Sequence, residues 1–303
     1  MKPNITSLFG SLWAMAPAHI EGFAHALYSI DTTDPIAGSF IDAGHAEVLY
    51  EVEAGKAYIP ITGVIMKSVP AAVRWLGMPA TSTLEVSAAI DAAERDPEVH
   101  ELIFVIDSPG GTVAGVQALA DQIKNVTKPT ASAISDMAAS AAYWIASQTD
   151  TIEANATAQI GSIGVYSVML DTSAAYAEAG ITVHVVSSGQ HKGSGVDGAP
   201  ISSEEINEEQ RMIDQLSSMF AATVASGRNL TAAQVATLAT GQMWLAGDAL
   251  AYGLIDEIYG PTLPDNKQAK VEGMNPRSEE PVDEETPEGE EQETEQDDDK
   301  VEA

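Results

Sequence analysis

Apolar residues gather in short runs from residue 57 to about residue 190, and most of these runs have the composition of β-strands. β-Branched and apolar residues in runs of five to ten predict strands. The runs are AYIPITGVIM (57–66), ELIFVID (101–107), TASAISD (130–136), TIEANA (151–156), SIGVYSVML (162–170) and ITVHVVSS (181–188). The stretch SPGG directly after ELIFVID is expected to close that strand in a turn.

Segments with helical spacing lie between the strands. The stretch 81–96 has Leu84, Ala88 and Ala92 four residues apart, with Thr81 or Ser82 as the cap. Further helices are predicted over 113–126, 138–150, 173–180 and, as a long amphipathic helix that ends near Gly227, 204–228. Strands that alternate with helices favour an α/β fold with a mainly parallel sheet flanked by helices.

Charge divides the chain unevenly. The sequence has 45 acidic and 14 basic residues, a net charge of −31. Residues 271–303 alone hold fifteen acidic and two basic residues and almost no apolar ones, too few to offset the entropy of ordering. We expect a disordered acidic tail over 263–303, a folded domain over 51–262 and an N-terminal extension over 1–50, which shows no clear period.

Composition excludes several classes of function. Such an acidic surface repels phosphate groups, so neither nucleic acid nor an anionic membrane is an expected partner. The chain has no cysteine, and no two of its six histidines have the spacing of a zinc-binding helix, so no metal and no cofactor are expected. The N-terminal apolar run is broken by Pro17 and is too short for a membrane anchor, which favours a cytoplasmic location.

Two features at strand ends suggest chemistry. The amides of Gly110 and Gly111 have no Cβ beside them and could form an oxyanion hole, although taken alone such a stretch is more often an ordinary turn between a strand and a helix. Ser140 is expected in the first turn of the helix after TASAISD, where unpaired amides favour negative charge. Taken alone, a serine among alanines is more often a packing residue.

Lys192 is the third candidate, and it is the only lysine between Lys128 and Lys267. It lies in a glycine-rich stretch just beyond the predicted strand ITVHVVSS. A lysine acts as general base when burial lowers its pKa, and loops over a strand end could bury it. His191 directly precedes it, and successive residues of an extended chain point to opposite sides, so only one of the two can face Ser140. The residues alone leave the choice between them open.

Five blocks of the sequence resemble, in order, those of the signal peptide peptidase A family of serine proteases, over about residues 57–260. The blocks are FVIDSPGG, SDMAASAAYWIAS, AQIGSIGV, SSGQHKG and ATGQMWLAGDALAYGLIDEI. The resemblance implies a nucleophilic Ser140 and a lysine base 52 residues later, which selects Lys192 over His191. It further implies that Ser162 orients the lysine, and that Gly110, Gly111 and the Ala141 amide beside the nucleophile form the oxyanion hole.

The same resemblance implies a ClpP/crotonase-like fold assembled as a homo-oligomer, and a serine endopeptidase with a Ser/Lys dyad. Two departures stand out: the chain shows no membrane anchor, and Ala141 and Ala142 stand where family members usually have two glycines. The first departure, together with the extension and the acidic tail, is more similar to the phage branch of the family, the head maturation proteases or minor capsid protein C.

A phage role implies scaffold, portal or capsid proteins as substrates, and a location in the host cytoplasm, within the procapsid or virion. Two alternatives stay open. One is a cytoplasmic housekeeping peptidase with the same chemistry. The other is a non-catalytic scaffolding protein on a crotonase-like core, in which Ser140 and Lys192 are structural residues.

Overall fold

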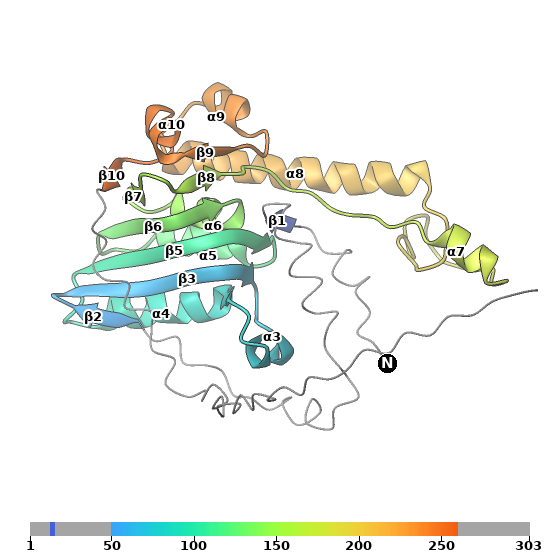
Figure 1. Cartoon of the computed structure of the whole chain (residues 1–303), viewed down its shortest axis with the longest axis horizontal. Coiled ribbons are helices and arrows are strands. Elements are labelled where there is room, and N and C mark those ends of the chain that lie inside the picture. The colour runs from blue at the N-terminus through green and yellow to red at the C-terminus, as the bar shows by residue number, and fades with distance from the viewer. Residues whose placement is uncertain (1–12, 16–49, 260–303) are drawn as a thin grey trace, which may run out of the picture. The chain divides into compact units, whose positions relative to one another are not determined.

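The computed structural model describes residues 13–15 and 50–259, whose strands form one twisted sheet (Figure 1). Apart from residues 13–15 and Tyr50, the predicted extension (1–50) and the acidic tail (263–303) lie outside the described residues, so the predicted domain boundaries stay predictions. Within the described part of the chain, no helix has both the length and the apolar character needed to cross a membrane.

The strands of the described residues run from three to twelve residues in length. They are β1 (Trp13–Met15), β2 (Glu51–Glu53), β3 (Lys56–Met66), β4 (Ala80–Ser82), β5 (Glu101–Thr112), β6 (Thr130–Ala139), β7 (Thr151–Asn155), β8 (Gln159–Gly161), β9 (Met243–Leu245) and β10 (Glu257–Tyr259). The central order is β10-β7-β6-β5-β3-β2, and β3, β5, β6, β7 and β10 are mutually parallel. This confirms the α/β class with a mainly parallel sheet.

Four additional short strands extend this sheet. β4 pairs with β3 and β8 pairs with β6, both in parallel, while β9 is antiparallel to β8. β1 pairs with β5 in the antiparallel direction. The carboxyl ends of the central parallel strands therefore meet several short elements, at the edge where α/β sheets usually place their sites.

Helices cover the sheet and extend beyond it. They are α3 (Ala71–Trp75), α4 (Thr83–Arg95), α5 (Val116–Lys124), α6 (Ala141–Ala146), α7 (Ser173–Glu178), α8 (Ser203–Gly227), α9 (Ala232–Leu238) and α10 (Ala246–Ala251). α4, α5 and α6 pack side by side behind the strands, and one end of α8 packs on α6 and α9. The other end of α8, α7 and the residues that connect the two helices form an arm that leaves the sheet (Figure 1).

The main core lies between the sheet and α4, α5 and α6. Both aromatic residues of α6 are fully buried: the Trp144 ring stacks on Phe220 of α8 with 4.3 Å between ring centroids, and Tyr143 donates a hydrogen bond to the Leu254 carbonyl. Burial raises the pKa of Tyr143 well above its usual value. α6 is thus held on both sides, and the residue at its start, Ser140, is held with it.

Most of the predicted elements are confirmed, among them the strand at 57–66, the helix at 173–180 and the long helix that ends at Gly227. Ser82 is the cap of α4 and accepts a hydrogen bond from the Glu85 amide. The helix is present, but the residues whose spacing predicted it do not form its buried face, because Leu84 and Ala88 are exposed. The face that packs on β3 consists of Val86, Ala89, Ile90 and Ala93.

Two predicted strands are absent from the described structure. Residues 162–170 form no strand beyond a single bridge at Tyr166, and residues 181–188 have no regular structure. The apolar side chains of the second segment, Ile181, Val185 and Val186, are exposed to 51%, 44% and 97%. A strand needs a hydrogen-bonded neighbour, and none of the residues that the structure describes pairs with this segment.

Candidate active site

SPGG does not end its strand, contrary to the sequence prediction. β5 continues through these residues to Thr112, but its pairing shifts on both sides: between Thr62 and Val64 of β3, and between Ile106 and Ser108 towards β6. Such irregularities accommodate Pro109, which has no amide hydrogen to donate to a ladder. The shift places Gly110 opposite Val64, beyond the regular part of the sheet.

Ser108 fixes the amide of Gly110. Its side chain is fully buried; the hydroxyl donates to the Gly63 carbonyl at 2.6 Å and accepts from the Gly110 N–H at 3.1 Å. Gly110 has φ 96°, a conformation that favours glycine. An oxyanion at this position would therefore share the Gly110 amide with Ser108.

Gly111 is required by close packing between strands. A Cβ at this residue would lie 1.8 Å from the Ile65 carbonyl oxygen of β3, which is backbone and cannot give way. Close packing against β3 therefore requires a glycine at this position, whether or not Gly111 also belongs to an oxyanion hole.

Ser140 stands at a sharp junction between β6 and α6. It is the N-cap of α6, one residue before the first turn in which it was expected, and its backbone has φ 54° and ψ −118°. This combination lies outside the regions that residues with a Cβ normally adopt, and it costs about 1–3 kcal/mol. A strained serine between a strand and a helix is the arrangement that presents nucleophiles in α/β hydrolases.

The surroundings of Ser140 come from the chain after β8. Its amide donates to the Gly161 carbonyl at 2.7 Å, and its Oγ lies 3.5 Å from the Gly164 carbonyl. The side chain is only 1% exposed. Because Ser108 of β5 pairs with Ala138 of β6, Gly110 and Ser140 are each two residues further along neighbouring strands. The structure thus brings Ser140 to the Gly110–Gly111 end of β5.

Ala141 and Ser162 complete the group on this chain. Ala141 is the first residue of α6, where helix amides have no carbonyl partner within the helix. Ser162 follows Gly161 directly, has φ 50°, is buried, and donates its amide to the Gln242 carbonyl at 2.8 Å. Ser140, whose amide bonds the Gly161 carbonyl, and Ser162, the next residue after Gly161, therefore both have a positive φ.

Two carboxylates lie at the same irregular point of the sheet, Asp107 on β5 and Asp136 on β6. Partial burial of the Asp107 carboxyl raises its pKa, the charge of Asp136 raises it further, and a hydrogen bond from the Met137 amide opposes the rise. The negative potential here disfavours an acidic ligand beside the sheet end.

Lys192 is not brought to Ser140 within a single chain. It is exposed, in a turn between α7 and α8 where its amide donates to the Gly189 carbonyl, rather than buried at a strand end as expected. The hollow that it lines is built by residues 183–205, without any residue of β5, β6 or α6. His191 lies in the same exposed turn.

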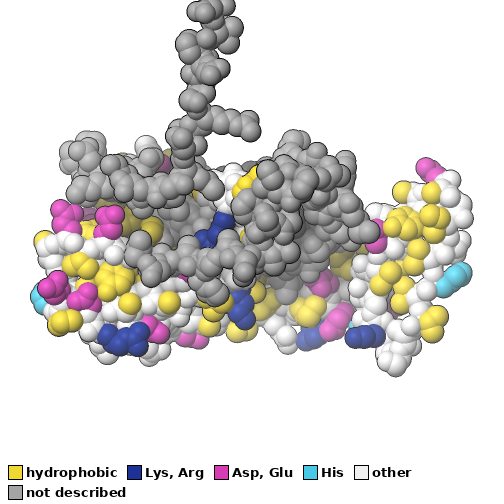
Figure 2. All heavy atoms as spheres, turned by 90° about the horizontal axis from the view of Figure 1, so that it is seen from below, with side chains coloured by type: hydrophobic (Ala, Val, Ile, Leu, Met, Phe, Trp, Pro, Cys, Tyr) yellow, Lys and Arg dark blue, Asp and Glu magenta, His cyan; other side chains and the backbone are white. Residues whose placement is uncertain are grey.

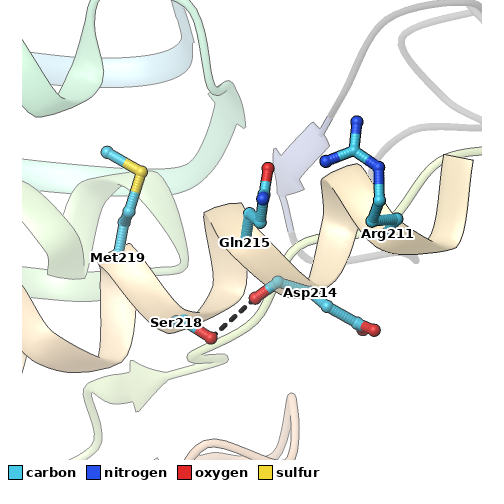
Figure 3. A pocket seen from close by; sticks show the side chains of 5 residues that line it. All are labelled: Arg211, Asp214, Gln215, Ser218 and Met219. Atoms are coloured by element: carbon cyan, nitrogen blue, oxygen red, sulfur yellow. Dashed lines mark hydrogen bonds between the residues drawn. The ribbon is translucent and has the colours of Figure 1, made fainter. Parts of the chain in front are cut away.

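A second hollow lies along α8 and contains none of the predicted site residues. Figure 3 shows its lining on one side of the helix, where the Ser218 hydroxyl bonds the Asp214 carbonyl; the other lining residues are Arg211, Gln215 and Met219. Among residues 13–15 and 50–259, no three histidine or acidic side chains are grouped so that they could hold a metal ion.

Ser108 and Gly161 are site residues that sequence reasoning missed. Ser108 belongs to the SPGG stretch and was passed over in favour of the glycines, so the signal was present. Gly161 contributes only its carbonyl to the site, at φ 112°, and no residue pattern reveals a single backbone contact of this kind.

Comparison with known proteins places these residues in a family. Residues 122–269 match the model of peptidase family S49, a stretch that includes Ser140, Ser162 and Lys192. The chain is similar to capsid assembly protease C of Escherichia phage lambda, 32% identical over 86% of this chain and 64% of that protein. It is also similar to head-tail preconnector protein GP5 of Enterobacteria phage P21, 31% identical over 69% of this chain and 42% of that protein.

The chain thus spans less than two thirds of the length of either phage protein. A solved structure of a ClpP1 mutant from Listeria monocytogenes aligns with 67% of this chain and 90% of its own, at 15% identity and a TM-score of 0.44. Residues 122–269 thus carry a domain of peptidase family S49, a family of serine-type peptidases.

Proposed function

We propose that the protein is a serine endopeptidase with Ser140 as its nucleophile. The observation that carries the proposal is the backbone of Ser140, φ 54° and ψ −118°, at the junction of β6 and α6. Strain of this kind persists where the surrounding structure enforces it, and it is concentrated at active sites. The buried aromatic residues of α6 and the Gly161 carbonyl provide that enforcement here.

Lys192 is the general base in this proposal, and it comes from a neighbouring copy of the chain. Two observations support this arrangement. Lys192 lies on the arm, among residues that do not contact Ser140, and the arm exposes apolar side chains that a single chain leaves uncovered. Figure 2 shows hydrophobic side chains over this end of the molecule; those exposed by 40% or more include Leu170, Ile181, Val185, Val186, Val196 and Ile206.

Covering such a patch with a second copy would desolvate Lys192 at the same time. Burial disfavours the charged ammonium group and lowers its pKa towards the range in which a neutral amine accepts the proton of Ser140. In this proposal Ser162, which follows Gly161, orients the incoming amine; its support is that the Gly161 carbonyl accepts the hydrogen bond of the Ser140 amide.

The reaction follows from these positions. The Ser140 oxygen attacks the scissile carbonyl while Lys192 takes its proton, and the oxyanion is bound by the Ala141 amide with those of Gly110 or Gly111. The peptide bond breaks, and the leaving amine takes a proton from the lysine. Water, activated by the same lysine, then releases the acyl group from Ser140.

The proposed substrates are structural proteins of a tailed phage, namely scaffold, portal or capsid proteins, cut inside the procapsid in the host cytoplasm. Support comes from the similarity to capsid assembly protease C of phage lambda, which covers 86% of this chain. The acidic segment 263–303 would serve as a scaffold-related or self-cleaved part.

The test is proteolysis of co-expressed capsid proteins and of the chain itself, followed by mass spectrometry. Ser140→Ala should abolish every cleavage, by a factor of about 10³ or more. Ser147→Ala is the matched control: Ser147 is also a fully buried serine, at the other end of α6, and its hydroxyl donates to the Trp144 carbonyl. Cleavage that survives in Ser140→Ala would refute the proposal.

A further inference from the structure

Strand β1 lies in the place that a bound peptide would take beside Ser140. At Gly110 and Gly111, one edge of β5 is paired with β3. The other edge is paired with β6 as far as Ser108, and beyond Ala139 the chain turns away through Ser140 into α6. β1 pairs with residues 110–112 of β5, so it takes the edge that β6 leaves.

The register places β1 next to the nucleophile. Ser108 pairs with Ala138, so a β6 that continued straight would bring residue 140 opposite Gly110. Instead the chain bends, and Met15 is the residue opposite Gly110. The backbone of Met15 therefore takes the position on this edge of β5 that residue 140 would have taken, next to the point where the chain bends away at Ser140.

The side chain of Met15 fills an apolar pocket that is separate from the main core. Met15 is 1% exposed and packs with Val64 of β3 and Val73 of α3, which are themselves buried. Partly buried side chains surround this cluster, namely Met66, Val69, Met78, Ala80 and Tyr166. The pocket is thus built by β3, α3, β4 and Tyr166, and is filled by a residue more than forty positions earlier in the sequence.

One polar group at this pocket has no partner. The Tyr166 hydroxyl is buried and makes no hydrogen bond with any residue that the structure describes. A buried hydroxyl normally finds an acceptor. A peptide in the pocket could supply one.

We propose that Trp13–Met15 is an internal pseudo-substrate that occupies the peptide-binding site of the enzyme. Substrates then bind as an antiparallel strand on residues 110–112 of β5 and place an apolar side chain of about methionine's size in the pocket between Val64 and Val73. Strand addition of this kind gives affinity through main-chain hydrogen bonds and specificity through pockets for alternate side chains. The proposal rests on the assignment of Ser140 as the nucleophile.

A tethered segment competes strongly with a free peptide. Its effective concentration at its own site is of the order of millimolar. The sequence of the segment, GSLWAMAPA over residues 10–18, has no charge to oppose its entry into an apolar site. External substrates therefore bind weakly until β1 leaves, and removing the Met15 anchor should open the site.

The test measures binding without catalysis, in the full chain with Ser140→Ala. The probe is a fluorescein-labelled peptide of sequence GSLWAMAPA, followed by fluorescence anisotropy. Met15→Asp in this background should bind the peptide at least about tenfold more tightly than Met15→Leu, because the internal competitor is lost. Met15→Ala, which shortens the anchor without adding a charge, should act in the same direction to a smaller extent.

A second peptide tests the pocket without altering the protein. GSLWADAPA, with aspartate in place of methionine, should not bind to Met15→Asp. Equal affinity of the first peptide for Met15→Asp and Met15→Leu, no binding to either, or equal binding of the two peptides would each overturn the proposal.

The binding experiment and the cleavage experiment can fail independently of each other. If the peptide binds as expected and the chain with Ser140 intact cleaves nothing, residues 110–112 of β5 remain a peptide-binding site that β1 occupies, and the peptidase assignment fails together with the name pseudo-substrate. If Ser140-dependent cleavage occurs and Met15→Asp changes neither affinity nor rate, the pseudo-substrate fails and the peptidase assignment stands.

Discussion

The end of the sheet around Ser140 and the arm that carries Lys192 belong to one chain but are built in opposite ways. Around Ser140 almost every side chain is buried, and backbone contacts hold strained conformations at Ser140 and Ser162. Along the arm, residues 181–188 lack regular structure and expose valine and isoleucine side chains.

The difference indicates how the two halves of the proposed dyad are organised. The nucleophile half is completed by the fold of a single chain, since β5, β6, α6 and the segment after β8 all contribute to it. The proposed base, Lys192, is exposed, and the described residues of its own chain do not bury its side chain. Assembly of copies would bury this side chain, so that activity would appear only in the oligomer.

Mixing two inactive variants is the strongest way to break this comparison. Ser140→Ala and Lys192→Ala should each be inactive alone. Combined in one oligomer, they should recover about a quarter of the wild-type activity, because some sites then join an intact serine and an intact lysine from different chains. The measurement is peptide cleavage after the two variants are mixed under conditions that let subunits exchange.

His191→Ala serves as the control for this experiment and should stay active. No recovery on mixing, with subunit exchange verified, would show that both residues act within one chain. Loss of activity in His191→Ala with full activity in Lys192→Ala would overturn the choice of base.

A charge on the arm should dissociate the oligomer. Val186 is 97% exposed in the single chain, so Val186→Asp should change the free energy of unfolding of the monomer by no more than about 0.5 kcal/mol. In the oligomer the same charge would be buried without a partner, which is costly. Light scattering after gel filtration should show smaller particles, with cleavage lost in parallel.

Leu84→Asp is the matched control for Val186→Asp. Leu84 is 54% exposed on α4, away from the arm, and the substitution should leave the particle size unchanged. An unaltered oligomer in Val186→Asp would mean that the arm does not mediate assembly.

The same contrast explains what the sequence could predict. Strands 57–66 and 130–136 and the helix that ends at Gly227 were predictable because their partners lie in the same chain, and burial imposes a period on the residues. Residues 181–188 have equally apolar side chains, but among residues 13–15 and 50–259 no strand pairs with them. The apolar composition of residues 181–188 therefore predicted a strand that the structure does not contain.

The register of β5 against its neighbouring strands was the other feature that the sequence could not predict. The continuation of β5 through SPGG depends on shifts against β3 and β6, which are tertiary contacts. β1 is three residues long in a region without a period, and it forms a strand only because β5 has a vacant edge. Ser140 and Lys192 were candidates from their positions in the sequence, but only the resemblance assigned them the roles of nucleophile and base, since a serine among alanines carries no chemical pattern of its own.

Ser108→Ala tests how sharply the sheet end is positioned. The hydroxyl holds the Gly110 amide and the Gly63 carbonyl, so its loss should lower kcat about tenfold, less than removal of an oxyanion donor, with KM nearly unchanged. Steady-state kinetics on a peptide substrate give this split.

Ser132→Ala is the matched control, because Ser132 is a fully buried serine of β6 that bonds the Thr149 hydroxyl away from the site. Both variants should lose about 1–3 kcal/mol of unfolding free energy. If kcat falls equally in both, Ser108 has only a structural role.

Ser140→Gly gives the smallest expected effect. Glycine adopts φ 54° and ψ −118° without a Cβ clash, so the strain of about 1–3 kcal/mol is relieved, against about 0.5–1 kcal/mol of additional chain entropy. Ser140→Gly should therefore unfold in urea with a free energy about 1 kcal/mol higher than that of Ser140→Ala, which keeps the Cβ, while both are inactive. Ser147→Gly, at an ordinary helical φ of −61°, should be less stable than Ser147→Ala. A Ser140→Gly variant no more stable than Ser140→Ala would mean that the junction is unstrained, and the sheet end would lose the feature that sets it apart from the arm.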